Sequence, residues 1–496
     1  MKIAYVQMKV SAGHPDINTK KILQLIDEAR TQGADMIIFP PESISGKFLG
    51  GASLEKSFQR DRELCKEKIF AAAKNIVVIL DGKNNFESFD VKFSSAPFSL
   101  EKNFSAEKIS RPMIQIGCVG VQNTGKTIYT FDGGSAVFNS RGEVVQYAEP
   151  FTECLNFIEL DEIDKMPALE LPEVSEAEKI YRAISYGVKN FLEQIGMKKV
   201  VIGVSGGIDS AVAAALYVQV VGAENVYLVN MPSKFNSDTT KNLSDRLAKN
   251  LGCKYFVVPI QESVDWTVKQ LEERGIEVSD FVKENIQARD RSSRILAAIA
   301  ASIGGVFTCN ANKAESTVGY ATLYGDEAGF LSALADLWKF QVYDLARYMN
   351  EKIYRREVIP QGIIDIVPSA ELSNAQNVDE GKGDPLRYPY HDYLLRAFVE
   401  RNQTPEEILT WYADGELEKE IGCEIGLVEK YFPTAKDFID DLERWWKAFK
   451  VMGVAKRIQS PPIIAVTDKP FGSRSESQNG VHFTKKYLEL KNKILA

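Results

Sequence analysis

Hydrophobic and polar positions along the first third of the chain follow the pattern of a sheet flanked by helices. Short apolar runs predict strands, and longer stretches with apolar residues every three or four positions predict helices. In chain order these are a strand at 2–8, a helix at 16–32, a strand at 36–39, a helix at 54–74 and a strand at 76–80. Paired strands are then expected at 113–121, 136–139 and 144–147. The alternation predicts an α/β domain over residues 1–160.

Residues 161–176 are rich in acidic residues and proline, and we interpret them as a linker. From 177 onward the pattern alternates again: a helix to 195, a strand at 199–204, a helix, a strand at 226–230, a helix at 238–251 and a strand at 254–259. This order predicts a parallel sheet that binds its ligand at the carboxyl ends of the strands. The tail, with Trp411, Trp445 and Trp446 on amphipathic stretches, predicts a helical extension of a second domain spanning 177–496.

Composition narrows the class of protein. A chain of 496 residues with 45% hydrophobic and 26% charged residues is typical of a multidomain globular protein. A net charge of −8 argues against nucleic-acid binding, which needs Lys and Arg to replace counterions. The six cysteines form no Cys-x-x-Cys pair, and no apolar run reaches the ~20 residues that cross a bilayer. We therefore expect a soluble, cytoplasmic protein with reduced thiols.

The most informative segment is Ser-Gly-Gly-Ile-Asp-Ser at 205–210, which follows an apolar strand and opens into a helix. Free backbone N–H groups and the helix dipole favour an anion there, and glycines let the backbone approach it closely. Asp209 beside an anion requires a bridging cation such as Mg²⁺. A Gly-Gly turn with a Ser or Asp cap can also be purely structural. The whole segment, however, resembles the loop of the ATP-pyrophosphatase (PP-loop) family, which releases pyrophosphate and leaves AMP on the substrate.

Three further groups of polar residues follow, at 284–291, at 310–326 and at 336–339 with 368–372. Each alone could be an ordinary solvated loop. Together they supply what adenylation needs: carboxylates for Mg²⁺, a lysine for phosphate charge and amide or guanidinium donors for a polar substrate. The residues are Asp209, Glu315 and Asp326, then Lys339, then Asn285 and Arg289.

The motifs ENIQAR, NANKAE, VGYATLYGD, LWK and PSAEL resemble those of NAD⁺ synthases in order and spacing, and the chain is most similar to the long, glutamine-using branch. The resemblance implies ATP-dependent amidation of deamido-NAD⁺ through an acyl-adenylate, with ATP and Mg²⁺ required and a homo-oligomer expected. It also implies site residues. Those for ATP are Ser205, Gly206, Gly207, Asp209, Ser210, Asn310, Lys339 and Ser369; those for Mg²⁺ are Asp209 and Glu315; those for deamido-NAD⁺ are Asn285, Arg289, Asp326 and Lys456. Asp209 and Lys339 are the expected catalytic residues, and Asn310 stands where many relatives carry Thr.

The first domain resembles the nitrilase-type glutaminase that feeds ammonia to long NAD⁺ synthases, on the segments 2–7, 34–42, 94–98 and 131–135. Glu42 falls on the catalytic base of that family, but its Lys before Leu-Pro and its Cys before Glu-Asp are missing. Cys118 lies in an apolar strand, where a buried thiol is the simpler interpretation. Without a thiolate no thioester forms. We therefore expect a shortened, degenerate glutaminase domain and an enzyme that uses ammonia.

Three alternatives stay open at this point. The enzyme could still hydrolyse glutamine. It could be a PP-loop enzyme that modifies tRNA, although the acidic composition and the unpaired cysteines argue against that class. It could also be a nucleotide-binding subunit without catalysis, which would leave the combination of Asp209, Glu315, Asp326 and Lys339 unexplained.

Overall fold

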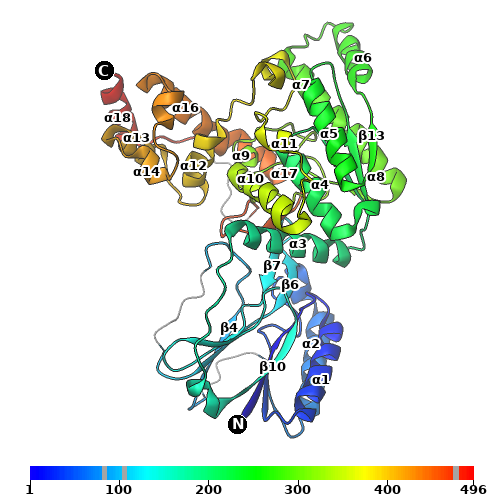
Figure 1. Ribbon diagram of the computed structural model, residues 1–496, viewed down its shortest axis with the longest axis vertical. Helices are drawn as coiled ribbons and strands as arrows, with labels where there is room; N and C mark the ends of the chain where they lie inside the picture. Colours follow the sequence, from blue (N-terminus) through cyan, green and yellow to red (C-terminus); the bar gives the residue numbers. More distant parts are fainter. Residues whose placement is uncertain (81–85, 103–108, 473–479) are drawn as a thin grey trace. The chain divides into compact units, whose positions relative to one another are not determined.

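The computed structural model describes residues 1–80, 86–102, 109–472 and 480–496 (Figure 1). The chain forms two compact units. The first comprises Met1–Phe191 with Ala465–Thr467, and the second comprises Leu192–Ile464 with Asp468–Ala496. Within the described part of the chain, no helix is long and apolar enough to cross a membrane.

The first unit contains a mixed sheet in the order β10-β1-β2-β3. Its strands are β1 (Lys2–Gln7), β2 (Met36–Ile38), β3 (Val77–Ile79) and β10 (Cys154–Glu159). The first three are parallel, and β10 pairs antiparallel with β1. A second sheet has the order β4-β5-β8-β9, with β4 (Asp90–Ser94), β5 (Met113–Gly117), β8 (Ala136–Phe138) and β9 (Val144–Tyr147). The strands β6 (Val119–Asn123) and β7 (Thr127–Asp132) form an antiparallel pair.

Alternation of side chains along β1 explains how these parts form layers, because successive residues of a strand point to opposite faces. Ala4 and Val6 share a core with residues of the helices α1 (Pro15–Thr31) and α2 (Lys56–Ala72). Ile3 and Tyr5 share another core with residues of the second sheet. One face of the first sheet is therefore covered by helices and the other by the second sheet.

The strands predicted at 2–8 and 36–39 and the helices predicted at 16–32 and 54–74 are confirmed, with ends shifted by one or two residues. Strand β4 was not predicted. All five of its residues are half-buried, so it lacks the in–out alternation that identifies a strand from sequence. The structure divides the chain inside α3 (Glu176–Gln194) rather than at 161–176. Residues early in α3 belong to the first unit, where Arg182 forms an ion pair with Glu149 at 2.8 Å.

The second unit is built on a parallel sheet in the order β13-β12-β11-β14. Its strands are β11 (Val200–Gly203), β12 (Val226–Asn230), β13 (Lys254–Val257) and β14 (Val306–Phe307). The helices among them are α4 (Ile208–Val221), α5 (Asp238–Leu251), α6 (Gln261–Glu272), α7 (Asp280–Arg289) and α8 (Ala297–Ile303). The chain moves outward from β11 to β13 and then returns to the other side of β11 as β14. This reversal is a topological switch point, where α/β sheets bind ligands beyond the carboxyl ends of their strands.

Most of the rest of the second unit is helical, as predicted for the tail (Figure 1). Its helices are α9 (Lys313–Val318), α10 (Lys339–Tyr348), α11 (Gln361–Asp365), α12 (Tyr388–Val399), α13 (Pro405–Asp414), α14 (Leu417–Ile421), α15 (Leu427–Tyr431), α16 (Ala435–Ala448), α17 (Val454–Gln459) and α18 (Lys485–Leu495). Trp445 and Trp446 are buried in a core that α12, α13 and α16 share. This tryptophan pair is therefore part of the hydrophobic core.

Candidate functional site

The phosphate-loop segment joins β11 to α4 and is held by its own serines. Ser205 N–H donates to Ser210 Oγ at 3.3 Å, Gly207 N–H donates to Ser205 Oγ at 3.2 Å, and the Ser210 hydroxyl donates to the Gly207 carbonyl at 3.0 Å. Gly206 has a φ of +89°, and a Cβ there would lie 2.4 Å from the Thr240 carbonyl oxygen. Glycine is required at 206 both by this φ and by the close approach of α5.

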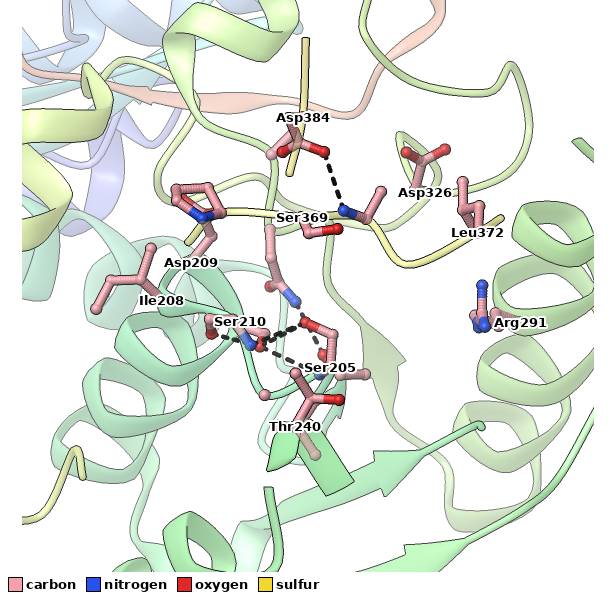
Figure 2. Close-up of a pocket in the computed structure, with 18 of the residues that line it drawn as sticks. Ser205, Ile208, Asp209, Ser210, Thr240, Arg291, Asp326, Ser369, Leu372 and Asp384 are labelled. Atoms are coloured by element: carbon pink, nitrogen blue, oxygen red, sulfur yellow. Dashed lines mark hydrogen bonds between the residues drawn. The ribbon is translucent and has the colours of Figure 1, made fainter. Parts of the chain in front are cut away.

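The segment lines a cavity of about 260 Å³ in the second unit (Figure 2). The carboxyl ends of β11, β12 and β14 contribute Gly203, Asn230 and Thr308. Met231 and Leu296 give part of the wall an apolar character, and the segment 366–372 closes another side. The cavity thus lies where the sheet topology favours a ligand, and it offers both apolar and charged surface.

A buried lysine joins two acidic residues at this cavity. Lys339 Nζ lies 2.5 Å from Asp209 Oδ2 and 3.4 Å from Glu315 Oε1. Asn312 donates to the other oxygen of Asp209 at 3.1 Å and caps α9 in a reciprocal arrangement with Glu315. The hydroxyl of Tyr388 donates to Glu315 Oε1 at 3.1 Å, and the Tyr388 ring lies 4.7 Å from Lys339 Nζ. Residues far apart in sequence therefore form one charged cluster, which brings together three of the predicted site residues, Asp209, Glu315 and Lys339.

Burial governs the protonation of this cluster. It raises the pKa of Glu315, although the positive charge of Lys339 opposes the shift. Burial by itself would lower the pKa of Lys339, but the charges of Asp209 and Glu315 outweigh it, and the pKa of Lys339 is raised. The ammonium is therefore charged at neutral pH and sits between two carboxyl groups.

The donor set fits Mg²⁺. Asp209 and Glu315 each direct a carboxylate oxygen to the same ammonium, so both oxygens can reach a shared cation. Mg²⁺ is commonly held by one or two carboxylates together with substrate phosphates and water. Among the described residues no group of three or more His, Cys, Asp and Glu side chains is arranged to hold a metal. A cation here would complete its coordination with phosphate and water.

The predicted substrate-binding residues divide into two groups. Asn310, Asp326 and Ser369 line the cavity, whereas Asn285, Arg289 and Lys456 do not. Arg289 donates to the Leu323 carbonyl at 3.1 Å, and Lys456 donates to the Gly319 and Ala321 carbonyls. Arg289 and Lys456 thus contact the backbone of the segment that carries Asp326. Asn285 donates to the Phe281 carbonyl of its own helix at 2.7 Å.

Two further charged residues line the cavity: Arg291, which belongs to the predicted polar group 284–291 but was given no binding role, and Asp384, which was not predicted. Arg291 donates to the Met231 carbonyl at 3.0 Å and to Asn236 Oδ1 at 3.1 Å, and burial lowers its pKa to about 10. It lies in the π-helical turn η4 (Asp290–Leu296), which no 3.6-residue pattern reveals. Asp384 accepts hydrogen bonds from Ala370 N–H at 3.0 Å and from the Tyr320 hydroxyl at 3.1 Å. Its neighbours come from other segments, so nothing local in the sequence identifies it.

The first unit contains the residue predicted as a glutaminase base. Glu42 is exposed and has a φ of +54° in a turn. Cys118 is buried, and burial raises the pKa of its thiol to about 12; the negative charges of Glu42 and Asp132 add to this shift, and the positive charge of Lys102 opposes it. Lys102 Nζ itself lies 3.4 Å from Asp132. This environment favours the protonated thiol over the thiolate at neutral pH.

Comparisons with known proteins identify relatives of this chain. The sequence profile of the NAD synthase family matches residues 180–422. The chain is 34% identical over 399 residues to the glutamine-dependent NAD(+) synthetase of Synechocystis, a match that covers 77% of this chain and 64% of that one. It is 33% identical over 322 residues to the Thermotoga maritima protein of the same name, covering 57% and 54%. The chain thus spans less than two thirds of the length of these two relatives.

A third relative, the glutamine-dependent NAD(+) synthetase of Xylella fastidiosa, is 27% identical over 502 residues and covers 84% of this chain and 91% of that one. Two solved structures share the fold. The glutamine-dependent NAD⁺ synthetase of Acinetobacter baumannii, in complex with ADP, has a TM-score of 0.67 at 23% identity and covers 96% and 97%. That of Cytophaga hutchinsonii has a TM-score of 0.77 at 14% identity and covers 100% and 99%. Residues 180–422 thus belong to the NAD synthase family, and the chain as a whole shares the fold of these synthetases.

Proposed function

We propose that this chain converts deamido-NAD⁺ to NAD⁺ with ATP, in the cavity that begins at residues 205–210. The observation that carries the proposal is the cluster of Asp209, Glu315 and Lys339 beside a glycine loop at the amino end of α4. Backbone N–H groups of such a loop favour phosphate, and the acidic pair fits a phosphate-bound cation. The Acinetobacter baumannii synthetase, which shares the fold, was solved with bound ADP, and this supports a nucleotide as the ligand.

The chemistry requires activation, because a carboxylate offers no leaving group to an amine. An oxygen of the nicotinate carboxylate attacks the α-phosphorus of ATP, and pyrophosphate departs. Ammonia then attacks the carbonyl carbon of the acyl-adenylate, AMP leaves with the bonding electrons, and a proton is lost from nitrogen. A bound Mg²⁺ would neutralise phosphate charge when present.

The residues of this chain contribute binding and charge. Ser205 to Ser210 hold the phosphates, Lys339 balances the negative charge that develops on the departing pyrophosphate, and Asp209 with Glu315 holds the cation. Asn310 and Ser369 are proposed to contact ATP. Deamido-NAD⁺ is proposed to bind through Asn285, Arg289, Asp326 and Lys456. The carboxylate and the α-phosphorus react faster because both are fixed in place.

We further propose that the nitrogen donor is ammonia and that residues 1–160 form a shortened glutaminase-like domain. The support is the buried, protonated thiol of Cys118, whose pKa the charge of Glu42 helps to raise. The relatives are named as glutamine-dependent enzymes, so the competing proposal is glutamine hydrolysis at Glu42, Lys102 and Cys118. A reactive thiolate at Cys118 would be required for that alternative.

One assay tests both proposals. Purified protein with ATP, deamido-NAD⁺ and Mg²⁺ is expected to form NAD⁺, AMP and pyrophosphate in equal amounts with ammonium and far more slowly with glutamine. Asp209→Asn should lower the rate by about 10²-fold or more, because one charge of the proposed cation site is lost. The matched control is Asp245→Asn on the exposed side of α5, where the carboxylate pairs with Lys249. Full activity of Asp209→Asn would refute the proposed site.

A further inference from the structure

Glu371 is a buried carboxylate beside the cavity to which neither the sequence analysis nor the proposed mechanism gives a role. It is 2% exposed and does not line the cavity. Its oxygens accept hydrogen bonds from neutral donors near the amino end of α5. Ser237 N–H donates at 3.1 Å, Asn236 Nδ2 at 3.2 Å and the Thr240 hydroxyl at 2.7 Å. The carboxylate thus ties the segment 366–372 to the start of α5.

Each of these contacts leads to a part of the cavity wall. Thr240 lies against Gly206 of the phosphate loop, since a Cβ at position 206 would lie 2.4 Å from the Thr240 carbonyl oxygen. Asn236 accepts a hydrogen bond from Arg291 Nη2 at 3.1 Å. On the other side, Glu371 N–H donates to Ser369 Oγ at 3.2 Å. Figure 2 shows Ser369, Thr240 and Arg291 around the cavity, each from a different segment.

The backbone at this position is unusual. Glu371 has a φ of +45°, a left-handed conformation that residues other than glycine adopt infrequently. Such a conformation persists where surrounding contacts determine it. Here the hydrogen bonds to the carboxylate supply those contacts, which indicates that the side chain, rather than the local backbone preference, holds the turn.

We propose that Glu371 is a positioning residue for ATP, which preorganises Ser369, Thr240 and Arg291 around the nucleotide. The inference rests on the proposed function and goes beyond it, because Glu371 would not touch the substrate. Fixing three walls of the cavity in advance lowers the cost of ordering them on binding, so the carboxylate contributes to nucleotide affinity.

The test is calorimetric titration of the full-length protein with ATP and Mg²⁺, without deamido-NAD⁺. Glu371→Gln removes the charge and turns one acceptor into a donor that faces other donors. Loss of hydrogen bonds to a charged acceptor is expected to weaken ATP binding about 10- to 100-fold. Glu371→Gly removes the carboxylate but relieves the positive φ, and it should weaken binding as much. In steady-state assays both changes should act mainly on the KM for ATP.

The matched control is Glu380→Gln, in the same stretch of chain, where the exposed carboxylate pairs with Lys382 at 2.6 Å. It should bind ATP like the wild type. Wild-type affinity in Glu371→Gly, with folding confirmed by its melting temperature, would overturn the inference. If the wild type binds no ATP, the proposed function fails and the inference with it.

A measurement on the wild type alone covers the case in which the variants do not fold. Amide hydrogen exchange should slow together in residues 236–241 and 367–373 when ATP binds, because Glu371 joins the two segments. Protection of only one segment would overturn the inference.

Discussion

At the scale of single residues, Asp392 shows how burial sets the properties of a group near the site. It lies on α12, and its Oδ2 accepts a hydrogen bond from Phe340 N–H at 2.9 Å, in the first turn of α10, the helix that begins with Lys339. Its Oδ1 has no hydrogen-bond partner among the described residues. Burial raises the pKa of this carboxyl group to about 7. A charge on Asp392 is therefore costly in the folded state.

This pKa predicts how stability depends on pH. The folded protein keeps the Asp392 proton up to about pH 7, whereas the unfolded chain loses it near pH 4, so the folded state binds more protons in that interval. The free energy of unfolding should therefore fall as pH rises from about 4 to 7, by on the order of a few kcal/mol from this group. In Asp392→Asn that contribution should disappear. Urea denaturation of both proteins at pH 5 and 8 measures it, and identical pH slopes would contradict the prediction.

At the scale of elements, two glycines next to α5 allow a matched pair of substitutions. Gly206, in the turn between β11 and α4, contacts the first turn of α5, and Gly252 follows the last residue of α5. Gly206 and Gly252 both have positive φ, +89° and +70°. A Cβ at 206 would overlap the Thr240 backbone in the first turn of α5, while at 252, the end of α5, nothing lies within 4 Å. The two positions therefore share backbone strain and differ in contact.

Gly252→Ala should cost about 1–2 kcal/mol of stability and leave ATP binding unchanged, since only the left-handed conformation is penalised. Gly206→Ala adds a clash with backbone that can be relieved only by moving the loop or α5. It should abolish measurable ATP binding and NAD⁺ formation. Urea denaturation and ATP titration of the two variants separate these effects, and normal ATP binding by Gly206→Ala would show that the loop is not held as described.

At the scale of the whole molecule, one unit carries the charged cavity and the other carries Glu42 and a buried thiol. If nitrogen comes from ammonia, a glutamine analogue that alkylates catalytic thiols should leave Cys118 unmodified, which mass spectrometry of the intact protein measures. The physical reason is the pKa of Cys118, about 12, which leaves well under ~1% thiolate at neutral pH.

The control for this experiment is Cys118→Ser, which should retain the ammonium-dependent rate and show the same lack of response. The opposite result would be that the analogue rapidly stops glutamine-dependent activity in the wild type, while Cys118→Ser has no such activity to lose. That result would establish glutamine hydrolysis at this thiol. Sedimentation of the same samples would test the predicted homo-oligomer.

Local pattern alone was enough to predict much of this protein. Hydrophobic periodicity identified β1, β2, α1 and α2, and the glycine–serine turn at 205–210 indicated a phosphate site, because turn chemistry and helix ends depend on neighbouring residues. The motifs that resemble those of NAD⁺ synthases contain the three residues of the charged cluster, Asp209, Glu315 and Lys339.

Tertiary structure decided what depends on residues far apart in the chain. It placed Lys339 between Asp209 and Glu315. It also directed Arg289 and Lys456 to backbone carbonyls of the segment that carries Asp326. Finally, it brought Arg291 and Asp384 to the cavity wall. Sheet order, a π-helical turn and burial produce these relations, and none of them leaves a periodic signal. The protonation states of Glu315, Asp392 and Cys118 belong to the same class, since desolvation depends on what the whole fold packs around a group.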